Sequence, residues 1–362
     1  MRYVESLNRA LHRLMADDPR VHLIGEDLLD PYGGAFKVAK GLSTAFPQQV
    51  ISTPISEAAI VGLGIGMAMR GFRPIVEIMF GDFVTLCMDQ IVNHAAKFPW
   101  VYNGQIQVPL TIRLPMGGRR GYGATHSQSL EALFMSVPLI RMVAPSHLHD
   151  PGDLLTGVVR GESDPVLFIE NKLLYARRLL DAEACRQETG FAVRAVNRAA
   201  MDYPTLCLSM APDEPPAVVL ICYGGMVPYA MDAAYRAFMA EEIVVELVVP
   251  ALIKPIPVAD LIPEISRCGK VLVAEEGVAT GGWGAEVASV IHEAAFDQLE
   301  GPVRRVGARE TPIPSARTLE EAVLPSDRDL ERAIYALAQR ERTAGQGWLP
   351  RERQDKASIY RH

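Results

Sequence analysis

Residues 50–69 read VISTPISEAAIVGLGIGMAM and change hydrophobic pattern within a few positions. The first six form a short apolar run, rich in β-branched residues, that predicts a buried strand over residues 50–55. The segment from Glu57 to Met69 is rich in alanine, glycine and aliphatic residues, and it predicts a helix that ends near Gly71. The carboxylate of Glu57 therefore lies in the first turn of a helix that directly follows a strand.

Two interpretations of Glu57 are open from its position alone. In the structural interpretation, Ser56 caps the helix and Glu57 complements its positive end, which is worth roughly 0.3–1 kcal/mol. In the functional interpretation, the carboxylate takes part in chemistry at the end of the strand. Position alone favours the structural interpretation, so a second cluster is needed to choose between them.

That second cluster is at residues 117–129, which read GGRRGYGATHSQS. This glycine-rich loop delivers His126 just before another predicted helix, and loops of this composition often carry function. Imidazole groups titrate near neutral pH and suit proton transfer, although a lone histidine is more often a solvated or capping residue. Arg119 and Arg120 either hold a substrate carboxylate through charge-assisted hydrogen bonds or form a solvated basic pair.

Seven short motifs follow one another along the chain: GED at 25–27, YGGAFKV at 32–38, TPISE at 53–57, RPIVEIM at 73–79, DQIVN at 89–93, HSQS at 126–129 and TGGWGAE at 280–286. Together, their order and spacing resemble the beta subunit of the decarboxylating component of 2-oxo acid dehydrogenase complexes, of the pyruvate, branched-chain and acetoin type. That family lies within the transketolase-like thiamine diphosphate enzymes. The resemblance spans nearly the whole chain.

The resemblance implies roles for five residues. Glu57 matches the glutamate that hydrogen-bonds the aminopyrimidine of thiamine diphosphate, so that its amine becomes an imine able to take the thiazolium proton. Ile55, Met79 and Phe83 match residues that wall the pyrimidine, with Phe83 stacking on it, although core packing is the alternative for Met79 and Phe83. His126 matches a histidine over the thiazolium that serves substrate orientation, proton transfer or acyl transfer. Glu57 and His126 are thus the expected catalytic residues.

One motif of this enzyme class is missing from the chain. The class binds the diphosphate through Mg²⁺ on a separate domain that carries a Gly-Asp-Gly motif, followed some thirty residues later by asparagine, and we find no such pair here. We therefore expect no metal ligand in this chain, and thiamine diphosphate and Mg²⁺ held mainly by an alpha subunit. The resemblance implies an α2β2 heterotetramer, in which this chain alone is inactive.

The glycines of the first helix look like a nucleotide-binding fingerprint at residues 62–66, which read GLGIG. The nucleotide motif needs its third glycine one residue later and at a strand-to-helix turn, so this run is not one. Ala58, Gly62 and Gly66 fall four apart on one helix face, where another backbone can approach closely. We expect a tight helix crossing there, between subunits, to offset the roughly 1 kcal/mol that each interior glycine costs.

The composition of the chain agrees with the family resemblance. With 362 residues, of which 49% are hydrophobic and 22% charged, the chain can form two α/β domains with proper cores. The formal net charge of -7 argues against a nucleic-acid partner, and no apolar run approaches the length needed to cross a bilayer. The N-terminus lacks the layout of a signal peptide, so we expect a cytoplasmic protein. The five cysteines show no CxxC spacing, which predicts reduced thiols.

The order of elements predicts two domains, each a mostly parallel sheet with helices on both faces. Strands are expected near residues 21–25, 50–55, 74–79, 110–114, 140–144 and 166–170, and then near 217–222, 244–249, 271–275 and 303–306. We assign a transketolase-like pyrimidine-binding domain to 1–178, a linker with an insertion to 179–215, a transketolase C-terminal-like domain to 216–340 and a tail to 341–362.

The second domain raises three further points. Residues 280–284 open a helix that either binds an anion or packs within the domain, and the resemblance favours packing and subunit assembly. At residues 249–251 the chain reads VPA where the family commonly has Asp-Leu-Arg, which favours a different acyl acceptor or a specialised pathway. In the tail, Asp355-Lys356-Ala357 lacks the strand hairpin around a lipoylated lysine, so we assign no lipoyl site.

Three functions remain open at this point. In the first, the chain and its alpha partner decarboxylate a small 2-oxo acid on thiamine diphosphate and pass the acyl group to a lipoyl acyltransferase or another acceptor. In the second, a split transketolase-like enzyme forms carbon-carbon bonds. In the third, the chain is a non-catalytic assembly subunit, which the presence of Glu57, Phe83 and His126 argues against.

Overall fold

The first sheet has seven strands in the order β11-β5-β6-β4-β3-β1-β2, in a computed structural model that describes residues 1–198 and 202–339. All neighbouring strands in it pair in parallel except β11 and β5. The strands are β1 (Val21–Gly25), β2 (Val50–Ser52), β3 (Arg73–Glu77), β4 (Thr111–Met116), β5 (Arg141–Val143), β6 (Val166–Asn171) and β11 (Leu252–Lys254). Six of these lie where the sequence predicts strands.

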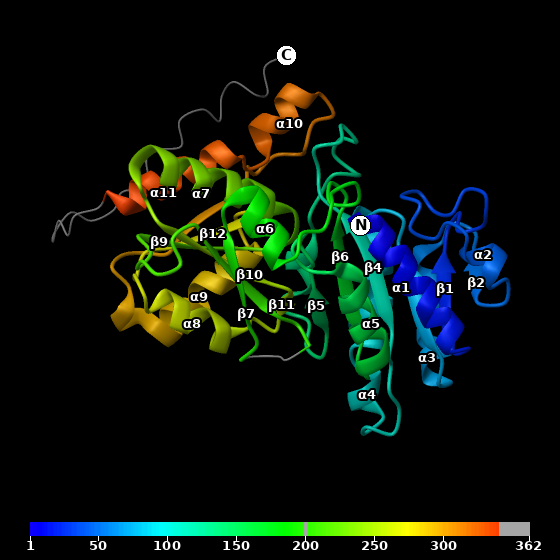
Figure 1. Ribbon diagram of the computed structural model, residues 1–362. Helices are drawn as coiled ribbons and strands as arrows, with labels where there is room; N and C mark the ends of the chain where they lie inside the picture. Colours follow the sequence, from blue (N-terminus) through cyan, green and yellow to red (C-terminus); the bar gives the residue numbers. More distant parts are fainter. Residues whose placement is uncertain (199–201, 340–362) are drawn as a thin grey trace, which may run out of the picture.

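Helices cover both faces of this sheet, as Figure 1 shows. Along β1, Leu23 faces a core that includes α1 (Tyr3–Asp17) and α5 (Pro151–Gly161), whereas Ile24 faces the core of α3 (Glu57–Met69). This alternation follows from the two-residue period of a strand, and burying each such side chain contributes about 1.5–3 kcal/mol. Short helices complete the domain: α2 (Leu42–Ala45), η1 (Gly81–Cys87), η2 (Gln90–Ala95), α4 (Phe98–Val101) and η3 (Glu131–Phe134).

The second sheet has six strands in the order β13-β12-β9-β10-β8-β7. Four are parallel, and β8 and β7 form an antiparallel edge. The strands are β7 (Ala192–Val196), β8 (Thr205–Ser209), β9 (Val218–Cys222), β10 (Val245–Pro250), β12 (Val271–Val278) and β13 (Arg304–Ala308). The predicted architecture of two mostly parallel sheets is thus confirmed.

Two groups of helices enclose the second sheet. One face carries α6 (Ala182–Thr189), α7 (Val227–Glu241) and α11 (Asp327–Ala338), and the other carries α8 (Val258–Ile265) and α9 (Trp283–Ala295). Three shorter elements lie between them: η4 (Gly224–Met226), η5 (Phe296–Gln298) and α10 (Arg317–Val323). Within the described ranges, no helix is both long and apolar enough to cross a membrane.

Two regions differ in detail from the expected organisation. Residues 179–215, expected to be a linker with an insertion, contain α6 and the β7–β8 hairpin, which extends the second sheet. Strand β11 follows β10 in the chain but pairs antiparallel with β5, so the second domain adds a strand to the first sheet. Lys254 secures this strand by donating to the carbonyl of Phe134, at 2.6 Å. The expected tail at 341–362 lies outside the described residues.

Candidate active site

The segments of the candidate site follow the carboxyl ends of neighbouring parallel strands. Glu26 follows β1, Glu57 comes shortly after β2, Met79 follows β3, and the loop at 117–129 follows β4. Because parallel strands end at one edge of a sheet, these segments from distant parts of the sequence meet there. Ligands bind at this edge in open α/β sheets.

Glu57 is the first residue of α3 and is buried, with 6% of its surface exposed. Ser56, at the N-cap, makes no side-chain capping bond, so the expected cap is absent. Glu26 is equally buried, and its Oε1 atom has no hydrogen-bond partner within the described residues. Burial raises the pKa of Glu26, and the nearby charges of Glu57 and Asp27 raise it further. Two neighbouring buried carboxyl groups, one with an unsatisfied oxygen, suit a ligand that brings hydrogen-bond donors.

His126 is held by aromatic rings and by hydrogen bonds. The centroid of its ring lies 4.8 Å from that of Phe80 and 5.1 Å from that of Phe83, in edge-to-face geometry. The Thr125 hydroxyl lies 2.9 Å from His126 Nδ1. Lys172 Nζ donates to the carbonyl oxygen of His126. The structure thus brings two of the predicted residues, His126 and Phe83, into direct contact.

Lys172 and Asp82 are charged site residues that the sequence analysis missed. Lys172 is completely buried at the end of β6, with Nζ 5.1 Å from the centroid of the Phe80 ring. Burial lowers the pKa of Lys172 to about 8, against the opposing charge of Asp82. Asp82 Oδ1 accepts from the backbone and side-chain nitrogens of Gln128, at 3.1 and 2.9 Å, while its Oδ2 has no partner in the described ranges.

A sequence signal for Lys172 did exist. The apolar strand that begins at Val166 ends in Glu170-Asn171-Lys172, three polar residues at the carboxyl edge of a parallel sheet. Such residues are either structural or functional, and here Glu170 pairs with Arg113 while Lys172 donates to the carbonyl of His126. Asp82 lies between Met79 and Phe83, in a segment whose sequence signal comes from its apolar residues.

The residues expected to wall the pyrimidine are only partly enclosed. Ile55 has 82% of its surface exposed, and Met79 and Phe83 are half-buried. If the site is incomplete, its apolar wall should be open to solvent on one side, as it is here. A further protein surface would then bury these apolar side chains.

A buried ion network supports the strand ends beneath the site. Arg113 on β4 binds both carboxylate oxygens of Glu170 through Nε and Nη2, each at 2.7 Å, and Glu77 through Nη1. The Tyr175 hydroxyl donates to Glu170 at 2.7 Å. Burial raises the pKa of Glu77, and the charge of Arg113 opposes that shift. One cation thus lies between two buried carboxylates, and its removal would leave both unpaired.

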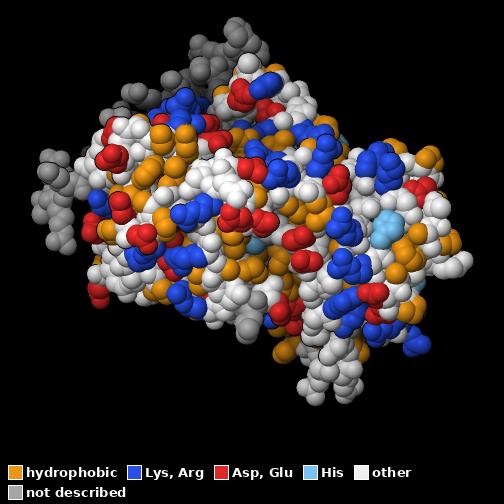
Figure 2. All heavy atoms as spheres, viewed as in Figure 1, with side chains coloured by type: hydrophobic (Ala, Val, Ile, Leu, Met, Phe, Trp, Pro, Cys, Tyr) orange, Lys and Arg blue, Asp and Glu red, His pale blue; other side chains and the backbone are white. Residues whose placement is uncertain are grey.

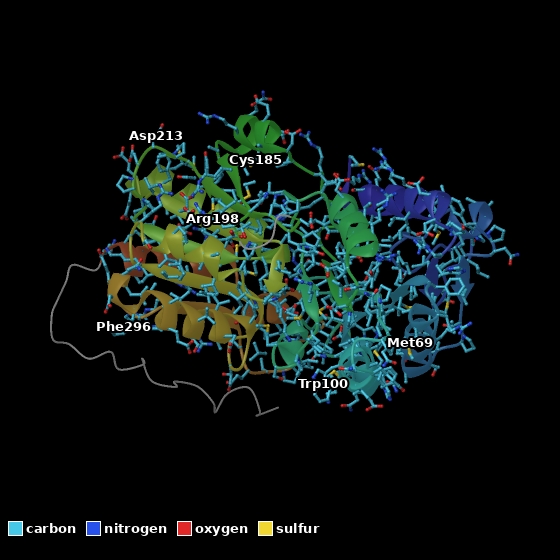
Figure 3. The ribbon with its side chains drawn as sticks, turned by 90° about the horizontal axis from the view of Figure 1, so that it is seen from below. Met69, Trp100, Cys185, Arg198, Asp213 and Phe296 are labelled. Atoms are coloured by element: carbon cyan, nitrogen blue, oxygen red, sulfur yellow. The ribbon has the colours of Figure 1, made fainter. Side chains whose placement is uncertain are left out.

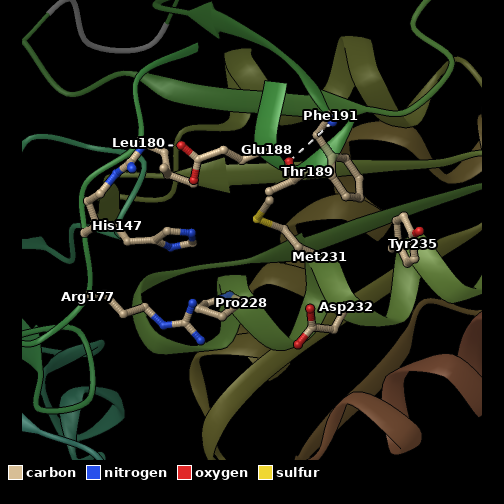
Figure 4. A pocket seen from close by; sticks show the side chains of 11 residues that line it. His147, Arg177, Leu180, Glu188, Thr189, Phe191, Pro228, Met231, Asp232 and Tyr235 are labelled. Carbon is tan, nitrogen blue, oxygen red and sulfur yellow. Dashed lines mark hydrogen bonds and ion pairs between the residues drawn. The ribbon is translucent and has the colours of Figure 1, made fainter. Parts of the chain in front are cut away.

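A separate cavity of about 440 Å³ lies beside α6 and α7 and is lined by none of the predicted site residues (Figure 4). Burial lowers the pKa of His147 there to about 3. Arg178 pairs with Glu188. Burial raises the pKa of Asp232, and the positive charge of Arg177 opposes that shift. The charges of its lining balance one another, so we assign it no ligand.

One group in the described residues resembles a metal site, with ligand atoms of Cys207, Glu246 and Glu264 within 4.8 Å of one another. Arg194 already pairs with both glutamates, at 2.8 Å from Glu246, and Arg267 lies 3.1 Å from Glu246. Because guanidinium groups occupy the position that a cation would take, we assign no metal there.

Two family descriptions match the chain: "Transketolase, pyrimidine binding domain" over residues 1–178 and "Transketolase, C-terminal domain" over residues 211–330. Among curated proteins, the chain is 36% identical over 340 residues to the pyruvate dehydrogenase E1 component subunit beta of Leifsonia xyli, covering 92% of this chain and 94% of that one. The corresponding mitochondrial subunit beta-1 of Oryza sativa is 34% identical over 336 residues, covering 91% and 84%.

This chain belongs to the pyruvate dehydrogenase E1 beta-subunit family. The relative in Rickettsia bellii is 33% identical over 331 residues, covering 91% of this chain and 96% of that one. A solved split-gene transketolase, described as an inactive beta4 tetramer, superposes with a TM-score of 0.69 at 20% identity, covering 93% and 98% of the two chains. The resemblance expected from the motifs is confirmed, and the solved structure supports the transketolase-like fold.

Proposed function

We propose that this chain is the beta subunit of a heteromeric, thiamine diphosphate-dependent 2-oxo acid dehydrogenase and supplies the pyrimidine half of its active site. The observation that carries the proposal is the buried Glu57 at the start of α3, on a chain whose relatives are pyruvate dehydrogenase E1 beta subunits. The free Oε1 of buried Glu26 and the aromatic cluster around His126 add support.

The residues have separate roles in this proposal. Glu57 holds the aminopyrimidine through a hydrogen bond that needs a carboxyl group shielded from water, and Ile55, Met79 and Phe83 exclude that water. When bound, thiamine diphosphate supplies the carbon that carries the acyl group. His126 orients the substrate and moves a proton near its ring, which the Phe80 and Phe83 edges hold in place.

The rest of the site comes from a partner in this proposal. An alpha subunit binds the diphosphate and Mg²⁺, and the two subunits form an α2β2 heterotetramer. The substrate is a small 2-oxo acid, with pyruvate as the first to test because relatives carry that name. The acyl group passes to a lipoyl acyltransferase or another acceptor. A cytoplasmic location stays a prediction.

The test is Glu57→Gln in the chain purified together with its alpha partner. We expect kcat for 2-oxo acid decarboxylation, measured with an artificial electron acceptor, to fall by about 10²-fold or more. Assembly and thermal stability should stay close to those of the wild type.

Glu286→Gln is a matched control, because Glu286 is an exposed glutamate in the first turn of α9. If Glu57 only complements the helix end, both variants will show a similar small loss of stability, of about 0.3–1 kcal/mol, and normal turnover. Unchanged turnover in Glu57→Gln would remove the catalytic role from this chain.

Product analysis separates the dehydrogenase from the split transketolase. The assembled enzyme is incubated with a 2-oxo acid and either lipoamide or an aldehyde. We expect acyl transfer to lipoamide. A ligated hydroxyketone, formed only with the aldehyde, would favour carbon-carbon bond formation instead.

A further inference from the structure

The loop that carries His126 belongs to the first domain but is held by carboxylates of the second. Glu320 lies on α10 and is buried, with 2% of its surface exposed. Its Oε1 accepts the backbone N–H of Arg119 at 2.7 Å, and its Oε2 accepts that of Gly121 at 3.2 Å. One side chain therefore fixes two backbone groups of the loop, about 200 residues away in sequence.

Glu276, near the end of β12, holds the start of the same loop. Its Oε1 accepts the backbone N–H of Gly118 at 2.6 Å, and its Oε2 accepts from Asn171 Nδ2 at 2.8 Å. Asn171 directly precedes Lys172, which donates to the carbonyl of His126. The hydrogen bonds of the two glutamates and Lys172 thus reach both the start of the loop and the histidine itself.

The loop also packs closely against the second domain. A Cβ atom on Gly118 would be 2.6 Å from Leu324 Cδ1 and 3.3 Å from Glu320 Oε1. Arg119 has a backbone φ of 67°, which residues other than glycine rarely adopt. Its guanidinium lies 4.2 Å from the centroid of the Tyr229 ring. Backbone in such a conformation persists only where the surroundings determine it.

Charge strengthens this arrangement. Three contacts, at residues 118, 119 and 121, join backbone N–H groups to two buried carboxylates, and hydrogen bonds to an ionised acceptor are roughly twice as strong as neutral ones. The carboxylates come from α10 and β12, in the domain that the family resemblance links mainly to assembly. The geometry gives that domain a second task.

We propose that Glu320 and Glu276 are positioning residues, through which the second domain sets the place of His126 in the active site. The catalytic part of this inference rests on the proposed function, whereas the mechanical part does not. If the two carboxylates set the loop, releasing one will loosen residues 118–121 and slow the chemical step without weakening cofactor binding in proportion.

The test compares Glu320→Gln with Glu321→Gln in the assembled enzyme. Glu321 is the next residue of the same helix, and its half-exposed side chain pairs with Arg317 at 2.8 Å. A glutamine at 320 has one oxygen that can still accept a backbone N–H. Its amide NH₂ group replaces the other oxygen and cannot accept the second backbone N–H. We measure hydrogen exchange of residues 118–121, kcat and the Kd of thiamine diphosphate.

For Glu320→Gln we expect exchange at residues 118–121 to rise at least about tenfold and kcat to fall at least about tenfold. Exchange in the strand β12 and the cofactor Kd should stay within about twofold, which a general loss of stability would not allow. Glu321→Gln should match the wild type in every measurement. Normal exchange in the loop, or a loosened loop with normal kcat, would overturn the proposal.

Glu276→Gln is the second variant, used if Glu320→Gln does not fold. It should release Gly118, with the same pattern of loosened loop and lowered kcat. If the wild-type complex decarboxylates no 2-oxo acid, the proposed function fails. Exchange at residues 118–121 then decides the mechanical part alone, and unchanged exchange in both variants would overturn it.

Discussion

Two kinds of residue build the candidate site, and they differ in how far apart their partners lie in the sequence. Glu57 and His126, which we propose touch the cofactor and the substrate, each lie at the junction of a strand or loop with a helix. Glu320 accepts a hydrogen bond from Arg119, which is 201 positions away, and Lys172 reaches His126 across 46 positions. Folding therefore brings the residues that hold the loop to the site from distant parts of the chain.

Glu275 resolves the two interpretations of the helix start at residues 280–284. Its Oε1 accepts the backbone N–H of Gly284 at 3.0 Å, so the protein's own carboxyl group occupies the place at the start of α9 where an anion would bind. A Cβ atom on Gly282 would lie 2.4 Å from Glu275 Oε2, which explains the small residue there. The packing interpretation therefore fits the structure.

A pH dependence of stability follows from Glu275. Burial raises its pKa from 4.5 to about 8, against the hydrogen bond from Gly284. The folded state then binds one more proton than the unfolded state between pH 4.5 and about 8, so this group stabilises the fold at low pH and loses that contribution as pH rises through this window.

Glu275→Gln should remove this dependence. We expect the free energy of unfolding of the wild type to fall relative to the variant by about 2–5 kcal/mol between pH 5 and pH 8. Urea unfolding of the full chain at several pH values measures it. Glu241→Gln, exposed at the end of α7, should run parallel to the wild type, and a parallel Glu275→Gln curve would refute the assignment.

At the scale of elements, α3 has one closed face and one open face. A Cβ atom on Gly64 would meet Val76 Cγ2 at 2.8 Å, so Gly64 lets the helix lie against β3. A Cβ atom on Gly62 or Gly66 would meet no described atom within 4 Å apart from the backbone of its own helix, and the neighbouring Leu63 is 44% exposed. The helix crossing expected at these glycines is not made within the described part of the chain, so this face is free for a subunit partner.

Alanine substitutions on α3 distinguish the two faces. Gly62→Ala with Gly66→Ala should stabilise the chain alone by about 0.5–1 kcal/mol per site, because glycine is a poor helix former. The same pair should weaken association with the alpha subunit. Gly64→Ala should instead destabilise the chain by about 1–3 kcal/mol through overpacking. Urea unfolding and analytical ultracentrifugation check these outcomes, and normal association of the double variant would contradict the subunit crossing.

Exposed apolar side chains at the end of α3 and on α4 also agree with an interface in the first domain. Figure 3 labels Met69 at the end of α3 and Trp100 on α4, which are 36% and 77% exposed. Val101, next to Trp100, is 58% exposed. We therefore expect these exposed apolar side chains of the first domain to contribute to contacts with a partner subunit.

Two of the strands that the sequence did not predict, β11 and β7, lack a clear hydrophobic period. Strand β11 has only three residues, which is too few to show a hydrophobic period, and its partner β5 lies more than 100 positions earlier in the chain. In β7, burial is irregular because the strand lies at an edge, and Arg194 interrupts the apolar pattern with an ion pair to Glu246. The long parallel strands were predictable because they are continuous apolar runs bounded by turns.

At the scale of the whole molecule, two connections join the two α/β domains into one unit. One is strand β11, and the other is the set of hydrogen bonds that Glu276 and Glu320 accept from the loop that carries His126. Figure 2 shows acidic and basic side chains interspersed over one face. The sequence predicted the two sheets and the family. It could not predict how the second domain contributes to the site, because those contacts depend on how the domains meet.

The central claim is that this chain holds half of an active site. We would measure the rate of pyruvate decarboxylation, with thiamine diphosphate, Mg²⁺ and an artificial electron acceptor, while adding alpha subunit to a fixed amount of this chain. We predict no turnover without the alpha subunit and a rate that rises to a plateau near equal amounts of the two chains. Turnover by this chain alone would contradict the account.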